Sequence, residues 1–204
     1  GIKSIPWIGN ANLSVSLISV KKGHNRNNYF LNGKIVNTIT PYLSDDELSQ
    51  PYTLKQNKDI AYPGSVLNGK GFVLTISEAM RLSNQSENRK VVKKYLIGND
   101  LNNRPDCSPS RYVIDFQDWQ IERCKKYDGL FEIVHNRVYF ERQKKKGKEY
   151  REKWWLFGRR AVAMYKKFEK LPSVFATAKT TKYIGFIKIN KQDIVLDQSL
   201  TIVT

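Results

Sequence analysis

Residues 140–160 read FERQKKKGKEYREKWWLFGRR, and this stretch is the most informative part of the sequence about what the chain binds. Nine of its side chains are basic: Arg142, Lys144, Lys145, Lys146, Lys148, Arg151, Lys153, Arg159 and Arg160. After Glu141 the stretch contains only two acidic residues, Glu149 and Glu152. Such a concentration of positive charge is typical of a surface that binds a polyanion.

Gly147 divides this stretch, because glycine disfavours a helix that would run through it. We therefore predict a mobile basic loop over residues 142–146 and a helix over residues 148–157. Helical spacing would put Tyr150, Trp154 and Phe157 on one apolar stripe. Gly158 would then follow the last turn, where glycine is favoured as a C-cap.

Trp155 does not share that stripe, since a rotation of 100° per residue places it beside Lys148 and Arg151. It could contact a nucleic acid as an aromatic ring among cations, or it could pack beneath another segment of the chain. For Trp155 alone packing is the favoured interpretation. For the basic residues as a group we favour polyanion binding.

The overall composition supports a folded, strongly basic protein. The 204 residues are 40% hydrophobic and 12% aromatic, and the formal net charge is +16. A chain of this length can bury its own core as one domain, or as a domain with a fragment of another. No apolar run approaches the roughly 18 residues that span a bilayer, and no signal peptide or lipidation motif is visible. Nucleic acid is therefore a better partner than a membrane.

Few residues in the sequence could form a disulfide framework or a metal site. The chain has two cysteines, Cys107 and Cys124, and two histidines, His24 and His135. Their number and spacing predict no disulfide framework and no zinc site. A reducing cytoplasm is consistent with this usage.

Hydrophobic periodicity predicts an α+β (mixed α/β) fold. The predicted strands cover residues 13–18, 29–39, 72–76, 111–116, 174–180 and 183–189. The predicted helices cover residues 78–82, 87–97, 118–127 and 159–171, with Ser77 and Ser86 as the first two N-caps and Gly98 closing the second helix. The predicted buried faces are Val91, Val92, Tyr95 and Leu96 in the second helix and Val162, Tyr165 and Phe168 in the last. In the strand over residues 174–180, Val174, Ala176 and Ala178 alternate with the other residues. Residues 41–59 form a polar connector and residues 99–110 a loop. The first two strands cannot form a domain alone, so we expect them to pair with another segment.

No catalytic constellation stands out, and we predict neither a catalytic nor a metal site. The glycines at 64, 69 and 71 match no phosphate-binding loop, and turn geometry explains them better. Asp115 and Asp118 lie close enough to hold a metal ion, but such acids more often pair with an arginine or cap a helix.

Several segments, taken in order, carry a resemblance to a known family. They are WIGNA (7–11), LNG (31–33), TPYL (40–43), GKGF (69–72), SEA (77–79), YLIGND (95–100), RYVIDF (111–116), ER (141–142) and REKWWLFG (151–158). This ordered set, which continues to about Ile189, resembles the target recognition region of bacterial DNA adenine-N6 methyltransferases. The type that it resembles is the single-chain type II restriction–modification enzyme related to the MmeI family.

The resemblance implies a parent enzyme that uses S-adenosylmethionine to methylate adenine. It implies that residues 1–40 are the last strands of the methyltransferase domain, and that residues 41–204 are the target recognition domain. The family's Asn-Pro-Pro-Tyr tetrapeptide and its glycine-rich S-adenosylmethionine loop are both absent. We therefore expect the catalytic part to lie upstream of Gly1, and this fragment to be non-catalytic and to hold no cofactor.

The implied partners are double-stranded DNA and the upstream methyltransferase domain, in the bacterial cytoplasm. The DNA-binding candidates are Arg142, Lys144, Lys145, Lys146, Lys148, Arg151, Lys153, Trp155, Arg159, Arg160, Lys179 and Lys182. The last two lie between the final predicted strands and, with Arg104, are candidates for reading bases. An RNA-binding module and a protein-interaction domain with an acidic partner remain open as alternatives.

Overall fold

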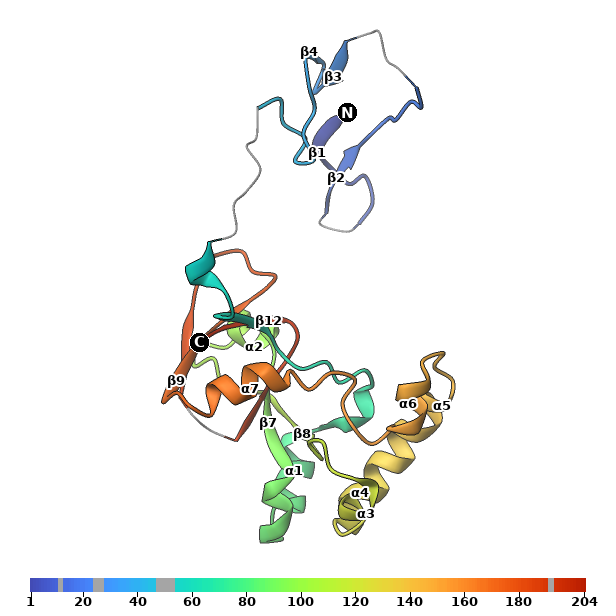
Figure 1. Ribbon diagram of the computed structural model, residues 1–204, viewed down its shortest axis with the longest axis vertical. Helices are drawn as coiled ribbons and strands as arrows, with labels where there is room; N and C mark the ends of the chain where they lie inside the picture. Colours follow the sequence, from blue (N-terminus) through green and yellow to red (C-terminus); the bar gives the residue numbers. More distant parts are fainter. Residues whose placement is uncertain (11–12, 24–27, 47–53, 191–192) are drawn as a thin grey trace. The chain divides into compact units, whose positions relative to one another are not determined.

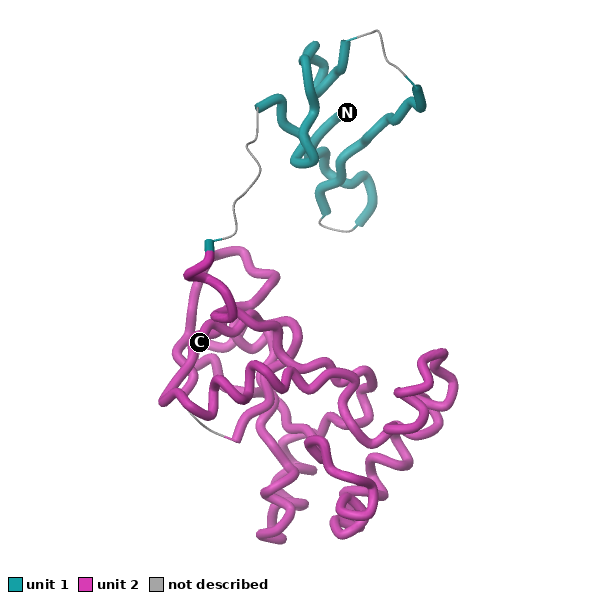
Figure 2. Tube along the Cα trace, viewed as in Figure 1, with its two compact units in different colours: residues 1–54 teal, residues 55–204 magenta. Residues whose placement is uncertain are grey.

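The computed structural model describes residues 1–10, 13–23, 28–46, 54–190 and 193–204. Ala11, His24 and residues 47–53 of the predicted connector lie outside the described residues. The chain forms two compact units, residues 1–54 and residues 55–204 (Figure 2). Both helices and strands are present, which confirms the α+β class (Figure 1). The assignment of residues 1–40 and 41–204 to two parts of a parent enzyme stays a prediction.

The first unit consists of two small antiparallel sheets. Strand β1 (Ile2–Pro6) pairs with β2 (Ser14–Leu17), and β3 (Tyr29–Leu31) pairs with β4 (Lys34–Val36). The predicted strand over residues 29–39 is therefore a hairpin. Asn32 and Gly33 form its turn with φ values of 52° and 80°, as a two-residue hairpin with the Asn-Gly pair requires. Among the described residues these strands do not pair with a later part of the chain, because β2 pairs with β1 and β3 with β4. Pairing with a part outside these 204 residues stays a prediction.

The second unit contains two four-stranded sheets. The first sheet has the order β11-β7-β8-β6, with β6 (Val73–Leu74), β7 (Val92–Leu96), β8 (Arg111–Ile114) and β11 (Ile194–Leu196). Its β11 and β7 are parallel, and its other pairs are antiparallel. The second sheet is antiparallel with the order β10-β9-β12-β5, from β5 (Ala61–Pro63), β9 (Ser173–Ala178), β10 (Ile187–Asn190) and β12 (Leu200–Val203).

Short helices join these strands. The α-helices are α1 (Ile76–Leu82), α2 (Gly98–Asn103), α3 (Ile121–Cys124), α4 (Asp128–Val134), α5 (Phe140–Gln143), α6 (Lys148–Glu152) and α7 (Val162–Phe168). A π-helical segment, η4 (His135–Tyr139), joins α4 to α5. The described residues also form three 3-10 turns, η1 (Lys55–Asn57), η2 (Lys70–Phe72) and η3 (Ser86–Lys90).

The helix predicted over residues 87–97 is wrong. Its second half is strand β7, and residues 86–90 form only a 3-10 turn. Val91, Val92, Tyr95 and Leu96 are buried as predicted, but most of them lie on a strand of the first sheet. The apolar pairs at residues 91–92 and 95–96 are four residues apart, a spacing that matches one face of a helix, so periodicity favoured the helix over the strand.

Two other helix ends and the buried face of one helix differ from prediction. Helix α1 is capped by Thr75 rather than Ser77, because the Thr75 hydroxyl accepts from the Glu78 N–H and Glu78 accepts from the Thr75 N–H. Gly98 begins α2, in the region predicted as a loop, rather than closing a helix. On α7, Val162 is exposed, and Met164 and Phe168 provide the buried face.

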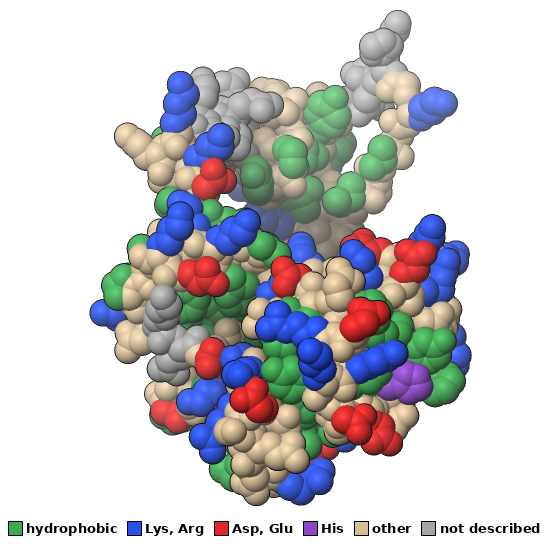
Figure 3. All heavy atoms as spheres, turned by 60° about the horizontal axis from the view of Figure 1, so that its bottom comes forward, with side chains coloured by type: hydrophobic (Ala, Val, Ile, Leu, Met, Phe, Trp, Pro, Cys, Tyr) green, Lys and Arg blue, Asp and Glu red, His purple; other side chains and the backbone are tan. Residues whose placement is uncertain are grey.

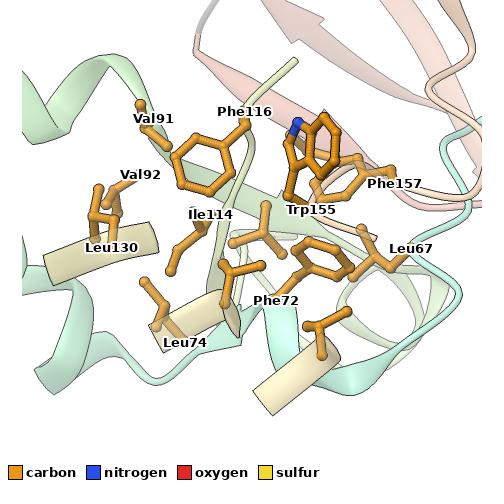
Figure 4. Close-up of a cluster of buried hydrophobic side chains, with 14 of the residues drawn as sticks. Leu67, Phe72, Leu74, Val91, Val92, Ile114, Phe116, Leu130, Trp155 and Phe157 are labelled. Carbon is orange, nitrogen blue, oxygen red and sulfur yellow. The ribbon is translucent and has the colours of Figure 1, made fainter. Parts of the chain in front are cut away.

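Two hydrophobic cores hold the second unit together. The larger one collects side chains from η2, β6, β8 and α4, including Phe72, Leu74, Ile114 and Leu130 (Figure 4). The smaller one lies between α7 and the second sheet and includes the alternating Val174 and Ala176 of β9, as the sequence predicted.

Gly71 is required by a close approach between η2 and η4. A Cβ atom at Gly71 would lie 2.7 Å from Cβ and the carbonyl oxygen of Arg137 and from Cγ2 of Val138. We expect Gly71→Ala to lower the free energy of unfolding by about 1–3 kcal/mol, because rigid backbone must move. Gly129→Ala is the control, since a Cβ there meets no atom within 4 Å and lies in α4. Urea unfolding should leave that control unchanged or stabilise it by up to about 1 kcal/mol; equal losses in both would contradict the steric explanation.

Candidate nucleic-acid interface

Five lysines of residues 140–160 lie together on the turn after α5, on α6 and just beyond it. We call Lys144, Lys145, Lys146, Lys148 and Lys153 the basic helical surface. Four of them are exposed, and Lys145 is half-exposed with its Nζ 3.5 Å from Glu141. Lysine and arginine side chains alternate with acidic ones over the face seen in Figure 3. The basic helical surface itself is not uniformly positive, because Lys145 and Lys148 each lie 3.5 Å from a glutamate, Glu141 and Glu152.

Arg151 fixes the turn that carries these lysines. Its Nη1 donates to the carbonyl oxygens of Lys145 at 2.7 Å and Lys146 at 3.0 Å. Gln143 Nε2 donates to the Arg151 carbonyl at 3.2 Å. The loop predicted to be mobile is therefore tied to α6, and Arg151 positions the lysines through its Nη1.

The predicted helix over residues 148–157 is shorter than expected, since α6 ends at Glu152. Trp154 and Phe157 are buried in the larger core, as the predicted stripe required. Gly158 is not a helix C-cap. Its N–H donates to the Leu67 carbonyl at 3.2 Å, and a Cβ there would lie 2.8 Å from Cβ of Asn68.

Arg142 is not part of an interface, because only 1% of it is exposed. It projects from α5 into the protein, where Nη2 donates to the carbonyl oxygens of Leu67 at 2.7 Å and Leu156 at 3.2 Å. Its Nε finds no partner among the described residues. Burial lowers the pKa of Arg142, and the side chain serves as an internal connection between distant loops. We withdraw it from the DNA-binding candidates.

Trp155 is buried as well, and its indole Nε1 donates to the Trp119 carbonyl at 2.9 Å. Figure 4 shows its ring beside Phe157 and Phe116. The packing interpretation is confirmed and the nucleic-acid contact is wrong. The helix ends before Trp155, so the angular argument that placed it among lysines does not apply.

Arg160 and Arg159 have different surroundings. The side chain of Arg160 is 19% exposed, and its Nη1 lies 3.5 Å from Asp118. It lines a polar cavity of about 400 Å³ together with Lys93, Asp115, Gln117 and Tyr165. Burial raises the pKa of Asp115 and raises that of Tyr165 to about 12. Asp118 thus pairs with an arginine, as acids of this kind usually do. Arg159 remains exposed.

Lys179 and Lys182 lie on the loop between β9 and β10, both exposed. Figure 1 draws this hairpin and helices α5 and α6 on opposite sides of the second unit, so the twelve predicted residues do not form one surface.

Arg104, the other candidate for reading bases, has partners within the chain. It donates to the Ser108 hydroxyl at 2.9 Å and lies 3.6 Å from Asp106.

The DNA-binding candidates predicted from the sequence do not include a cluster of asparagines on α2. Asn99, Asn102 and Asn103 are exposed, and Asn102 Nδ2 donates to the Thr180 carbonyl at 2.8 Å, which joins α2 to the β9–β10 loop. Asparagine is a residue type that reads adenine in the major groove. Their spacing of three and four residues, inside a region predicted as a loop, was the signal for one helical face.

Arg137 is another basic side chain that is already engaged. Its Nη2 donates to Glu78 at 2.6 Å, which links η4 to α1. That bond, with those from Thr75, lowers the pKa of Glu78 to about 2. Among the described residues no group of three or more His, Cys, Asp or Glu side chains could hold a metal ion, and no helix has the length and apolarity to cross a bilayer.

The fold is that of a mixed α/β module found in a restriction–modification enzyme. A solved structure of a Type IIL enzyme of this kind, in complex with DNA, matches 99% of this chain with a TM-score of 0.61 and 11% sequence identity. That enzyme is MmeI, and the match spans 29% of its chain. At this identity the match shows a shared fold. No protein-family model and no curated protein matches the sequence.

Proposed function

We propose that this chain recognises a specific sequence in double-stranded DNA, as the target recognition part of an adenine-N6 methyltransferase. The observation that carries the proposal is the basic helical surface, in a chain of net charge +16 whose fold recurs in an enzyme solved with DNA. Four lysines are exposed there, Lys144 and Lys146 on the turn that Arg151 holds and Lys148 and Lys153 on α6 or just beyond it. Exposed cations on a fixed support are suited to phosphate contacts, which set register and affinity on a duplex.

Methyl transfer in this proposal belongs to a catalytic domain outside these 204 residues. Neither Asn-Pro-Pro-Tyr nor a glycine-rich S-adenosylmethionine loop occurs in the sequence, so the residues present do not fit that cofactor. An enzyme that modifies a base must flip it from the stack, at a cost of a few kcal/mol. The role that we propose for this chain is to grip the duplex and select the sequence, in the bacterial cytoplasm and next to the methyltransferase domain.

Binding of the 204-residue chain to mixed-sequence duplex DNA, duplex RNA and single strands, each over a series of salt concentrations, tests the proposal. We expect duplex DNA to bind most tightly, with log K falling linearly against log salt because phosphate contacts release counterions. Selection from a random duplex library should then enrich one sequence. A preference for RNA, or no binding at low salt by a folded sample, would contradict the proposal.

A further inference from the structure

The loop between β9 and β10 presents three apolar side chains to solvent. Tyr183 is 74% exposed, Ile184 91% and Phe186 55%. We call these three residues the hairpin tip. A contiguous group of exposed apolar side chains on a polar protein marks a surface that a partner covers.

The hairpin tip stands on a well-defined base. Strands β9 and β10 pair in antiparallel register from Ile187 opposite Ala176 to Asn190 opposite Ser173. The Asn102 side chain holds the Thr180 carbonyl, and the Thr181 hydroxyl donates to the Tyr183 carbonyl at 2.9 Å. A hollow of about 240 Å³ is lined by Leu101 of α2 and by Tyr183 and Phe186. The tip is therefore held at its base while its three apolar side chains stay exposed.

The charges around the hairpin tip indicate a polyanionic partner. Residues 176–190 contain three lysines, Lys179, Lys182 and Lys188, and no acidic residue. Lys182 Nζ lies 5.2 Å from the centre of the Tyr183 ring, so a cation and an aromatic face are presented together. Duplex DNA offers both complements to this surface, phosphates for the lysines and stacked bases for the apolar side chains.

We propose that the hairpin tip inserts as an apolar wedge between base pairs of the bound duplex, with Lys179 and Lys182 on the flanking phosphates. The inference rests on the proposed function and adds to it a deformation of the DNA. It requires the duplex to reach the hairpin tip as well as the basic helical surface on the other side of the second unit (Figure 1). Aromatic and aliphatic side chains that enter a base step unstack it and change the local twist and bend. Removing such a wedge should weaken binding without changing the number of phosphate contacts.

The test compares the wild-type chain with the triple variant Tyr183→Ala, Ile184→Ala, Phe186→Ala. We expect the variant to bind mixed-sequence duplex DNA about tenfold or more weakly, the range of one lost base-stacking contact. The slope of log K against log salt should stay the same. Nicked plasmid that is ligated in the presence of wild-type protein should show a shifted topoisomer distribution, and the variant should abolish that shift.

Two single variants serve as controls. Phe175→Ala removes a side chain of similar exposure, 50%, from β9 of the same hairpin, and Met80→Ala removes one of 65% exposure from α1. Both should retain wild-type affinity and the topoisomer shift. Circular dichroism melting checks that all four proteins are equally folded.

Each outcome separates the inference from the function on which it rests. If the wild type binds and unwinds DNA while the triple variant does the same, the wedge is overturned and the proposed function stands. If the wild type binds without shifting the topoisomers, the wedge is again overturned. If the wild type does not bind duplex DNA at all, the proposed function fails and the wedge with it.

Discussion

Replacing Arg142 with alanine is expected to lower the free energy of unfolding of residues 55–204 by about 3–4 kcal/mol. The buried side chain donates to two carbonyl groups from separate loops, those of Leu67 and Leu156. Each carbonyl left unpaired costs about 1–3 kcal/mol, and the cavity adds to the loss. Relief of the desolvated guanidinium, whose Nε finds no partner among the described residues, offsets part of it.

Urea unfolding followed by tryptophan fluorescence measures this loss, because Trp154 and Trp155 are buried in the same unit. Lys144→Ala is the control, since it removes an exposed cation two residues away and should change stability by less than about 0.5 kcal/mol. Arg142→Met keeps most of the side-chain volume and loses the two hydrogen bonds. Its loss of unfolding free energy should therefore lie between those of Arg142→Ala and Lys144→Ala. Wild-type stability in Arg142→Ala would mean that the guanidinium does not join these loops.

Neutralising the basic helical surface should have the largest effect on DNA binding. In the variant Lys144→Gln, Lys146→Gln, Lys148→Gln, Lys153→Gln, we expect affinity at 0.1 M salt to fall by about 10²- to 10³-fold. The slope of log K against log salt should become shallower by about 3.6, because each of the four lost phosphate contacts removes about 0.9. The loss should be equal for all duplex sequences, since phosphates carry no sequence information.

The control for this variant changes the net charge by the same amount elsewhere. Lys58→Gln, Lys166→Gln, Lys167→Gln, Lys170→Gln removes four exposed lysines outside the basic helical surface. An equal loss in the control would show that overall charge, not contact, determines affinity. A loss that depends on the duplex sequence would instead show that the lysines of the basic helical surface read bases.

Most strands could be recognised from the sequence. The sequence did not show which of the predicted site residues are exposed or which of them lie together. The alternation at Val174, Ala176 and Ala178 predicted the buried face of β9 correctly. The apolar pairs Val91–Val92 and Tyr95–Leu96 did not distinguish a helix from a strand. Pairing with β8 and β11 makes this segment a strand. The separation of Lys179 and Lys182 from the basic helical surface follows from chain topology, which local patterns do not encode.

The sequence by itself determined the net charge, the concentration of lysine and arginine over residues 140–160 and the α+β class. Only the tertiary structure decided which of those cations face solvent. Arg142 and Lys144 are alike in the sequence, yet one is buried against the carbonyl of Leu67, 75 residues earlier, and the other is exposed. Burial depends on contacts between segments far apart in the chain, whereas the charge pattern of a sequence shows only which residues are adjacent in the chain.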